Sequence, residues 1–245
     1  RELEPGEVIL INQDGVQSFF PFPKTPIKQC VFEHVYFSRP DSFLFGKSVY
    51  SVRKLMGHVL AKEKPVDADV IVPVPDSGVI SAMGYSEESK IPFQMGLIRN
   101  HYVGRTFIEP QSQIRNFGVK IKLNAVKHII KGKRIIIIDD SIVRGTTSKK
   151  IVKMLRDVGA KEVHVRVSSP PTRHSCFYGI DTPNPGELIA SNMDVEQTRK
   201  YLGADSLYYI TLEKMLEIFG EQKDNFCAAC FDGNYPVPIT DHLTS

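Results

Sequence analysis

Apolar residues follow the pattern of a parallel α/β protein through the middle of the chain. Two apolar runs, Val70 to Pro75 and Ile135 to Ile138, predict buried strands. The isoleucines show no polar alternation, so both faces of that strand must be covered, as in a parallel sheet. Apolar residues recur at helical spacing from about Lys47 to Glu63, and a second helix after the isoleucines is expected to end at Gly159.

Further elements are predicted on either side of this centre. Val163, Val165 and Val167 alternate as a strand, so strand, helix and strand within about 35 residues form a βαβ unit. Another strand is expected from Phe93 to Ile98. Other predicted elements are a strand at 8–11 with a turn at 14–15, and short helices near 194–202 and 211–219. We therefore expect an α/β fold with a parallel twisted sheet flanked by helices.

Composition narrows the class of protein. The chain has 245 residues, of which 42% are apolar and 24% charged, which suits one folded core and excludes wholesale disorder. No apolar run approaches the ~18–20 residues of a membrane helix, and residues 1–5 lack a signal-peptide layout. The net charge of +3 argues against a surface devoted to nucleic acid. A cytoplasmic protein is expected, and the missing initial Met suggests a processed or truncated chain.

The most informative segment is IIIIDDSIVRGTTS, residues 135–148. Gly145 allows close approach of the backbone to a ligand, and the hydroxyls and helix N–H groups after it suit an anion. Adjacent carboxylates at Asp139 and Asp140 can accept hydrogen bonds from a sugar diol or bind Mg²⁺. An isolated Asp pair is more often a turn and helix cap. Here the whole pattern predicts a ligand with both phosphate and ribose.

Two other segments add to this site. Asp76, Ser77 and Gly78 end the first apolar strand, and alone they would be an ordinary turn. Residues 99–108 contain cations and a glycine, and residues 110–138 contain no Asp or Glu. Basic loops usually lie on the solvated surface. Here an anionic ligand would supply the opposite charge to the cations of residues 99–108. We expect this segment to be a mobile lid that excludes water.

Segment 135–148 resembles the phosphoribosyl-diphosphate (PRPP) signature of type I phosphoribosyltransferases. The resemblance implies that Asp139 and Asp140 hold the ribose hydroxyls and, with Ser77, Mg²⁺. It implies that the loop at residues 76–78 holds the diphosphate. The implied PRPP-binding residues are Asp76, Ser77, Gly78, Asp139, Asp140, Ser141, Arg144, Gly145, Thr146, Thr147 and Ser148. The implied catalytic lid residues are Arg99, Tyr102 and Arg105.

The resemblance narrows to the amidophosphoribosyltransferase family. It rests on YVGRTFI (102–108), DDSIVRGTTS (139–148), SSPP (168–171), CFYGID (176–181), SRPDS (38–42) and the cysteine-containing tail. The implied reaction joins ammonia, normally derived from glutamine, to PRPP, giving 5-phosphoribosylamine and diphosphate in the first step of purine synthesis. The implied partners are purine nucleotides as feedback inhibitors and further copies of the chain, with no nucleic acid and no membrane.

Two departures from the family pattern qualify the resemblance. The lid begins Arg99-Asn100-His101-Tyr102 where family members have Lys-Asn-Arg-Tyr, and guanidinium is a planar fork rather than a point charge. The family's N-terminal glutaminase domain, with its initial nucleophilic Cys, has no counterpart here. We expect residues 1–45 to be a junction and the start of the phosphoribosyltransferase domain, 46–190 the PRPP-binding core, and 191–245 C-terminal helices with a cysteine-containing tail. The chain is expected to use ammonia but not to hydrolyse glutamine.

The four cysteines are Cys30, Cys176, Cys227 and Cys230. Without a secretory signal a disulfide framework is not expected. Their spacing leaves a redox pair, a zinc site, buried inert thiols and a [4Fe–4S] cluster open. The family resemblance implies the cluster, because one branch of the family carries it on four cysteines at these motif positions. The terminal segments would then gather around a metal cluster with a structural, oxygen-sensitive role.

Two alternative functions come from other readings of the same motifs. A nucleobase phosphoribosyltransferase would need a hood that binds a base, and no such segment is identifiable. A non-catalytic PRPP sensor or nucleic-acid-binding regulator is supported only by the basic stretch at 115–134. Diphosphate release with ammonia separates these alternatives from an amidotransferase.

Overall fold

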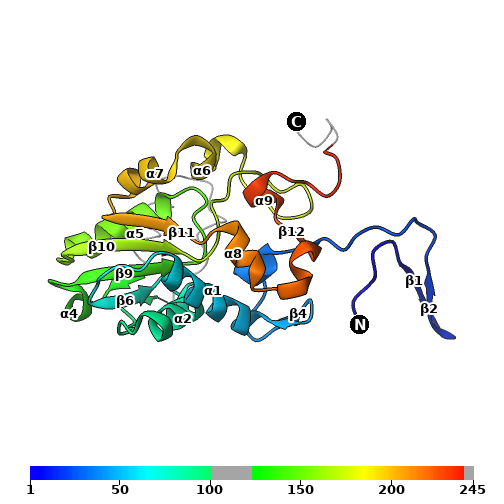
Figure 1. Ribbon diagram of the computed structural model, residues 1–245, viewed down its shortest axis with the longest axis horizontal. Helices are drawn as coiled ribbons and strands as arrows, with labels where there is room; N and C mark the ends of the chain where they lie inside the picture. The colour runs from blue at the N-terminus through cyan, green and yellow to red at the C-terminus, as the bar shows by residue number, and fades with distance from the viewer. Residues whose placement is uncertain (101–122, 240–245) are drawn as a thin grey trace.

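A four-stranded parallel sheet forms the centre of the computed structural model, which describes residues 1–100 and 123–239 (Figure 1). Its strands stand in the order β11 (Ser206–Tyr209), β10 (Glu162–Val167), β9 (Arg134–Asp139), β6 (Val70–Pro73). Ile137 of β9 lies between Val72 of β6 and Val165 of β10. The expected parallel α/β sheet is therefore confirmed.

Both faces of the sheet are covered, as the isoleucine run predicts. Ile135 and Ile137 belong to one apolar core with helices α4, α5 and α7, whereas Ile136 and Ile138 belong to another with α1, α2 and α8. The helices are α1 Val49–Glu63, α2 Val79–Ser89, α4 Lys127–Ile130, α5 Thr146–Asp157, α7 Val195–Leu202 and α8 Leu212–Glu217. Each isoleucine is at most 2% exposed and contributes about 1.5–3 kcal/mol by burial.

The predicted helices form close to their expected bounds. Helix α1 begins after Ser48, whose hydroxyl accepts a hydrogen bond from the Ser51 N–H and so caps the helix. In α7 the side chains of Asp194 and Gln197 form a capping box. No helix in the described part of the chain is long and apolar enough to span a membrane.

The chain reverses its direction across the sheet after β6. After α2 it passes the outer side of β6, where Phe93 forms one parallel bridge to Ile71, and it then returns to β9 on the other side. Open α/β sheets bind ligands at the carboxyl ends of the strands that flank such a switch point. The loops that follow β6 and β9 are therefore the candidate ligand site of this fold.

The predicted strand from Phe93 to Ile98 is wrong in its extent. Only β7 (Leu97–Arg99) is a strand, and it pairs antiparallel with β8 (Leu123–Ala125) outside the main sheet. Pro92 has no N–H to donate, and the N–H of Gly96 turns back to a carbonyl two residues earlier. These two residues limit the pairing with β6 to a single bridge.

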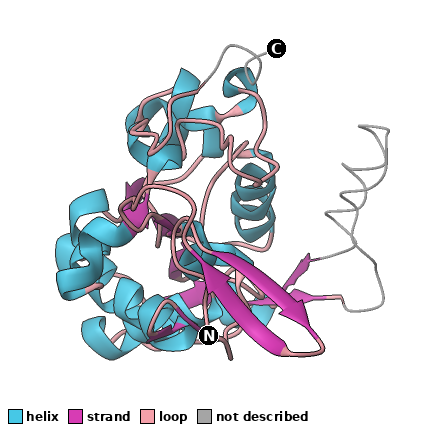
Figure 2. Ribbon diagram, turned by 90° about the vertical axis from the view of Figure 1, so that its right-hand side faces the viewer, coloured by secondary structure: helices cyan, strands magenta, loops and turns pink. Residues whose placement is uncertain are grey.

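The first strands form a hairpin that stands away from the sheet and its helices (Figure 1). It consists of β1 (Val8–Asn12) and β2 (Gly15–Phe19), which pair antiparallel around the predicted turn. Figure 2 views the molecule from the hairpin side. Ile11 and Val16, which lie opposite one another, are 73% and 65% exposed. The hairpin thus presents apolar side chains that the rest of the described chain does not cover.

Short elements from both ends of the chain pack together. Strand β3 pairs in parallel with β12, so that Cys30 lies opposite Cys227. Nearby, the His34 ring packs among the rings of Phe45, Phe219 and Phe226, with centroids 5.2–6.0 Å apart. The bounds of these and the other short elements of the described chain are β3 Gln29–Cys30, η1 Glu33–Phe37, β4 Phe43–Leu44, β5 Lys47–Ser48, η3 Pro185–Glu187, α6 Ile189–Asn192, η4 Gly220–Asn225, β12 Phe226–Cys227 and α9 Ala229–Asp232.

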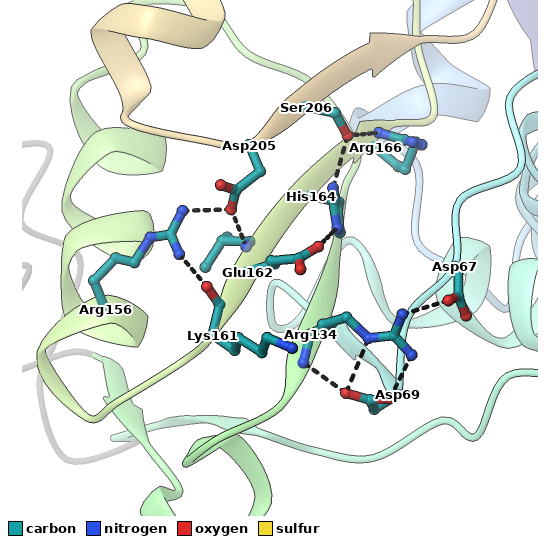
Figure 3. Close-up of polar contacts among 11 residues, drawn as sticks. Asp67, Asp69, Arg134, Arg156, Lys161, Glu162, His164, Arg166, Asp205 and Ser206 are labelled. Carbon is teal, nitrogen blue, oxygen red and sulfur yellow. Dashed lines mark hydrogen bonds and ion pairs between the residues drawn. The ribbon is translucent and has the colours of Figure 1, made fainter.

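Polar side chains join the amino ends of the sheet strands (Figure 3). Arg134, at the start of β9, binds Asp69 just before β6, with Nη2 and Oδ1 2.8 Å apart. Asp205, just before β11, accepts a hydrogen bond of 2.6 Å from the Val163 N–H and also binds Arg156. These contacts lie at the edge opposite the switch-point loops, and they tie the strands in register.

Candidate functional site

The loops after β6 and β9 meet at the carboxylate of Asp140. The Ser77 hydroxyl donates a hydrogen bond to Oδ1 of Asp140, and the Ser141 hydroxyl donates to Oδ2 at 2.8 Å. The peptide bond between Pro75 and Asp76 is cis. The structure therefore brings the two motifs singled out in the sequence together, with both oxygens of one carboxylate held in place.

Two glycines allow the loops and helices to approach this closely. A Cβ atom on Gly78 would lie 2.3 Å from the carbonyl oxygen of Ile138, so a side chain here would push α2 away from β9. Gly145 has a φ of 72°, and a Cβ there would lie 2.6 Å from Cδ1 of Ile189. Both helices consequently begin at glycine beside the switch point, where their N-terminal N–H groups favour an anion.

Asp139 and Asp140 form a buried pair of carboxyl groups, 8% and 6% exposed. The Asp140 N–H donates to Oδ1 of Asp139 at 3.0 Å. Burial raises the pKa of Asp139 well above its ordinary value, and the charge of Asp140 raises this pKa further. Hydrogen-bond donors such as sugar hydroxyls, or a divalent cation, would relieve the repulsion within such a pair.

The donor set fits Mg²⁺ bound together with a phosphorylated ligand. Asp139, Asp140 and the Ser77 hydroxyl supply hard oxygen donors. Within residues 1–100 and 123–239, no group of three or more His, Cys, Asp or Glu side chains could hold a metal ion. Mg²⁺ is usually bound by one or two carboxylates with substrate phosphates and water, so it does not require a cage made by the protein alone.

The segment from Gly145 to Ser148 opens α5 with the chemistry of a phosphate site. Its two threonine side chains are exposed and its serine is buried. The first N–H groups of a helix lack partners within the helix, and the helix dipole attracts an anion to them. Arg144 adds a cation beside this turn, and its Nη2 lies 2.8 Å from Oε2 of Glu187.

A segment that the sequence did not mark as functional packs over this turn. The Ile189 N–H donates to the carbonyl of Val143 at 2.9 Å, and the Ile189 side chain borders Gly145. The ammonium of Lys149 lies 4.1 Å from the ring centroid of Tyr201. These contacts join residues that are distant in sequence, so no local pattern could have revealed them.

The predicted lid residues are only partly described. Arg99, at the end of β7, forms an ion pair with Asp76 in the loop after β6. Tyr102 and Arg105 lie outside the described residues. The structure thus brings one predicted lid cation against the loop expected to hold the diphosphate.

The four cysteines, which come from three separate stretches of the sequence, line one cavity. Cys176 from the loop after β10 joins Cys30, Cys227 and Cys230, and all four are free thiols. The cavity is about 40 Å³, larger than the ~10–15 Å³ that one water requires. Burial raises the pKa of the Cys230 thiol, and the other three cysteines raise it further by their charge. A bound metal centre would stabilise these thiolates, so the residues fit such a group.

Comparison with known families agrees with the geometry of the two loops. Residues 46–175, more than half of the chain, match the phosphoribosyl transferase domain family. The chain therefore belongs to the phosphoribosyltransferase family, the class that the sheet and the two loops define.

Within this class the chain is homologous to amidophosphoribosyltransferases. It is 53% identical over 241 residues to amidophosphoribosyltransferase 1, chloroplastic, of Arabidopsis thaliana, covering 98% of this chain and 43% of the relative. It is 50% identical over 243 residues to the Bacillus subtilis amidophosphoribosyltransferase, covering 98% and 51%. The solved B. subtilis glutamine PRPP amidotransferase, complexed with ADP and GMP, matches with a TM-score of 0.89 and 49% identity, covering 98% of this chain and 54% of that chain. The chain spans about half the length of these relatives.

Proposed function

We propose that this chain transfers an amino group from ammonia to PRPP, releasing diphosphate and giving 5-phosphoribosylamine. The observation that carries the proposal is the junction of the β6 and β9 loops, where Ser77 binds Asp140 beside the glycine turn at Gly145. Such a site suits a ribose that carries both a phosphate and a diphosphate. Homology to amidophosphoribosyltransferases supports ammonia as the second reactant.

Each part of the site has a proposed task. Asp139 and Asp140 accept hydrogen bonds from the ribose hydroxyls and, with Ser77, would hold Mg²⁺. The turn from Gly145 to Ser148 binds the 5-phosphate, and the loop from Asp76 to Gly78 binds the diphosphate. Mg²⁺, when bound, neutralises charge on the diphosphate.

The chemistry requires positioning rather than a side-chain nucleophile. As the bond from ribose C1 to diphosphate breaks, positive charge develops on the sugar, and ammonia attacks from the opposite face. Arg99 is proposed to exchange its ion pair with Asp76 for the diphosphate oxygens, and Tyr102 and Arg105 are proposed to assist it. Cations placed where negative charge develops lower the barrier because they need no reorganisation during the reaction.

Diphosphate release is the measurement that tests this function. The chain is incubated with PRPP and Mg²⁺, and ammonia, glutamine or a free nucleobase is supplied as the acceptor. Release with ammonia supports the proposal. Release with a nucleobase, or no release with any acceptor, would contradict it.

We propose further that the four cysteines bind a [4Fe–4S] cluster. The described cysteines come from three separate stretches of the chain and line one cavity. A [4Fe–4S] cluster is held by four cysteine thiolates, the number that this cavity gathers. We assign the cluster a structural role.

Metal and sulfide analysis tests the cluster. Anaerobically purified protein is expected to be brown, to contain iron and acid-labile sulfide, and to lose its visible absorbance in air. Cys230→Ser is expected to abolish that absorbance. A colourless protein with stoichiometric zinc would overturn the assignment.

Regulation by purine nucleotides and assembly of several copies are also proposed. The solved B. subtilis relative is complexed with ADP and GMP, which supports nucleotide binding by this family. Inhibition of diphosphate release by purine but not pyrimidine nucleotides is the expected result. Light scattering is expected to show a homo-oligomer.

A further inference from the structure

The turn just before α5 is attached to one segment from further along the chain. This segment, residues 185–202, contains η3, α6 and α7 and is called here the covering segment. Its Ile189 N–H donates to the carbonyl of Val143 at 2.9 Å. Oε2 of its Glu187 lies 2.8 Å from Nη2 of Arg144. The turn proposed to bind the 5-phosphate is thus joined, by a hydrogen bond and an ion pair, to residues that are distant in sequence.

The next residue of the turn, Gly145, lies directly against two side chains of the covering segment. A Cβ on this glycine would lie 2.6 Å from Cδ1 of Ile189 and 3.4 Å from Cε1 of Tyr201. Gly145 has a φ of 72°, and a glycine adopts many other backbone conformations at little cost. Because Ile189 is 6% exposed and fixed in the same apolar core as β9, it limits the conformations open to this turn.

The covering segment packs on the turn without closing the proposed phosphate site. Gly145 is buried, whereas Thr146 and Thr147, whose hydroxyls are proposed to bind the 5-phosphate, are exposed. The packing contacts and the proposed ligand contacts therefore involve different parts of the turn. An effect of Ile189 on a bound phosphate would act through the position of the turn.

Asn192 holds the covering segment in its own shape around Ile189. Its side-chain amide nitrogen donates to the main-chain carbonyls of Pro185, Gly186 and Leu188 at 3.1, 3.2 and 2.8 Å. An amide has two N–H groups, so the three carbonyls share them. Since Leu188 precedes Ile189 and Asn192 follows it, these bonds fix the main chain on both sides of the isoleucine.

We propose that Ile189 is a positioning residue for the 5-phosphate of PRPP, which holds the turn at Gly145 in the conformation that receives the phosphate. A phosphate bound by main-chain N–H groups and hydroxyls requires several donors to converge on it. A turn that is ordered before the ligand arrives binds more tightly than one that must be ordered by it. The inference deepens the proposed function and depends on it, because it takes Gly145 to Ser148 as the 5-phosphate site.

Two probes separate the two ends of PRPP. Ribose 5-phosphate carries the phosphate proposed for this turn, and inorganic diphosphate carries the group proposed for the loop after β6. The Kd of each probe, in the presence of Mg²⁺, is measured by calorimetry for the wild-type chain and for Ile189→Ala. Ile130→Ala is the matched control, because Ile130 is 0% exposed in the same apolar core but lies in α4, before β9.

We expect Ile189→Ala to raise the Kd of ribose 5-phosphate roughly tenfold, equivalent to about 1.4 kcal/mol, and the KM for PRPP by a similar factor. The Kd of diphosphate is expected to stay within about threefold of the wild type, a change below about 0.7 kcal/mol. In Ile130→Ala both Kd values should stay within the same limit, although this variant also loses a buried side chain. A general loss of structure would instead weaken both probes in both variants.

Three results would overturn the inference: wild-type affinity for ribose 5-phosphate in Ile189→Ala, equal loss of both probes in that variant, or an equal loss of ribose 5-phosphate in Ile130→Ala. If Ile189→Ala does not fold, Asn192→Ala decides, because Asn192 is exposed and its removal leaves the core intact. A raised Kd for ribose 5-phosphate with that of diphosphate unchanged then supports the inference, and any other result overturns it. Failure of the wild-type chain to bind both ribose 5-phosphate and PRPP would instead refute the proposed function.

Discussion

At the scale of single residues, two neighbouring carboxyl groups have unequal surroundings. Asp140 has a hydroxyl on each of its oxygens, from Ser77 and from Ser141. Asp139 accepts a hydrogen bond from the Asp140 N–H and is held in an environment that raises its pKa. Asp140 is therefore the carboxylate whose two oxygens are held in place by neighbouring hydroxyls before a ligand binds.

The first prediction tests this orientation. Asp140→Asn is expected to lower kcat/KM for PRPP by about a hundredfold or more, because it removes the oriented charge. Ser77→Ala should cost roughly 10–100-fold, the usual effect of losing a partner that orients a ligating carboxylate. Ser86→Ala is the control, since its hydroxyl binds the Ile91 carbonyl elsewhere in the same helix region. Unchanged kinetics in Ser77→Ala would contradict the role given to this contact.

The second prediction concerns the pH dependence of stability and the His34 ring. Burial, and then the charges of Arg53 and Lys47, lower the pKa of His34 to about 4. The unfolded chain has the ordinary value of ~6.5, so it binds a proton first as the pH falls. The neutral His34 ring therefore makes its full contribution to the free energy of unfolding above pH ~6.5. That free energy decreases by about 2–3 kcal/mol as the pH falls to about 4.

His34→Phe should remove that part of the pH dependence. Both ring nitrogens of His34 lack hydrogen-bond partners within the described residues, so Phe gives up no polar contact. Urea unfolding of both proteins at pH 7 and pH 5 is the measurement. The variant is expected to gain stability relative to the wild type at the lower pH. An identical loss between the two pH values in both proteins would contradict the assignment.

At the scale of secondary-structure elements, α1 and α2 are packed so closely that glycine is required on each. A Cβ on Gly57 would lie 2.0 Å from the Ser81 carbonyl oxygen, and a Cβ on Gly84 would lie 2.0 Å from that of Lys54. Of these two helices, α1 precedes β6 and α2 directly follows the β6 loop. The spacing of these two helices thus determines where the proposed diphosphate loop lies relative to β9.

The third prediction is that Gly84→Ala destabilises the fold by about 1–3 kcal/mol, because the added methyl group overpacks the crossing. Urea denaturation measures the loss. Gly186→Ala is a matched control, since a Cβ there has no atom within 4 Å. Equal stability of the Gly84 and Gly186 variants would show that the helices separate without cost.

The sequence predicted an element correctly where its apolar residues form one contiguous run without polar residues among them. Four isoleucines allow a buried strand and little else, so β9 and its neighbour α5 were found from sequence. Strand β11 was missed because Ser206–Tyr209 is short and mixes polar and aromatic residues. The two loops proposed to bind the ligand could be singled out in the sequence because each is a contiguous motif. Ile189 was not found, because its contacts join segments that are distant in sequence.

At the scale of the whole molecule, the carboxyl and amino ends of the sheet strands are proposed to have separate tasks. The carboxyl ends of the strands hold the proposed ligand loops, and the amino ends hold the polar network of Figure 3. In that network His164 lies between Glu162 and Ser206, with contacts of 3.1 and 2.9 Å. Stability and ligand binding should therefore respond to different substitutions.

The fourth prediction separates these two tasks. Asp205→Ala leaves the Val163 N–H without its partner and should reduce stability by about 1–3 kcal/mol. The KM for PRPP should remain unchanged, because the substitution lies at the opposite edge of the sheet. Thermal unfolding and diphosphate release are measured on the same preparation. A raised KM with unchanged stability would contradict the separation.

The pairing of β3 with β12 has a consequence for the order of events during biosynthesis. Cys30 leaves the ribosome before Cys176, and Cys227 and Cys230 are the last of the four to emerge. Chains emerge N-terminus first, so the cysteine cavity does not exist on a growing chain. Any metal centre bound by these four thiols is therefore installed after translation of the last of them, and interrupted chains never acquire it.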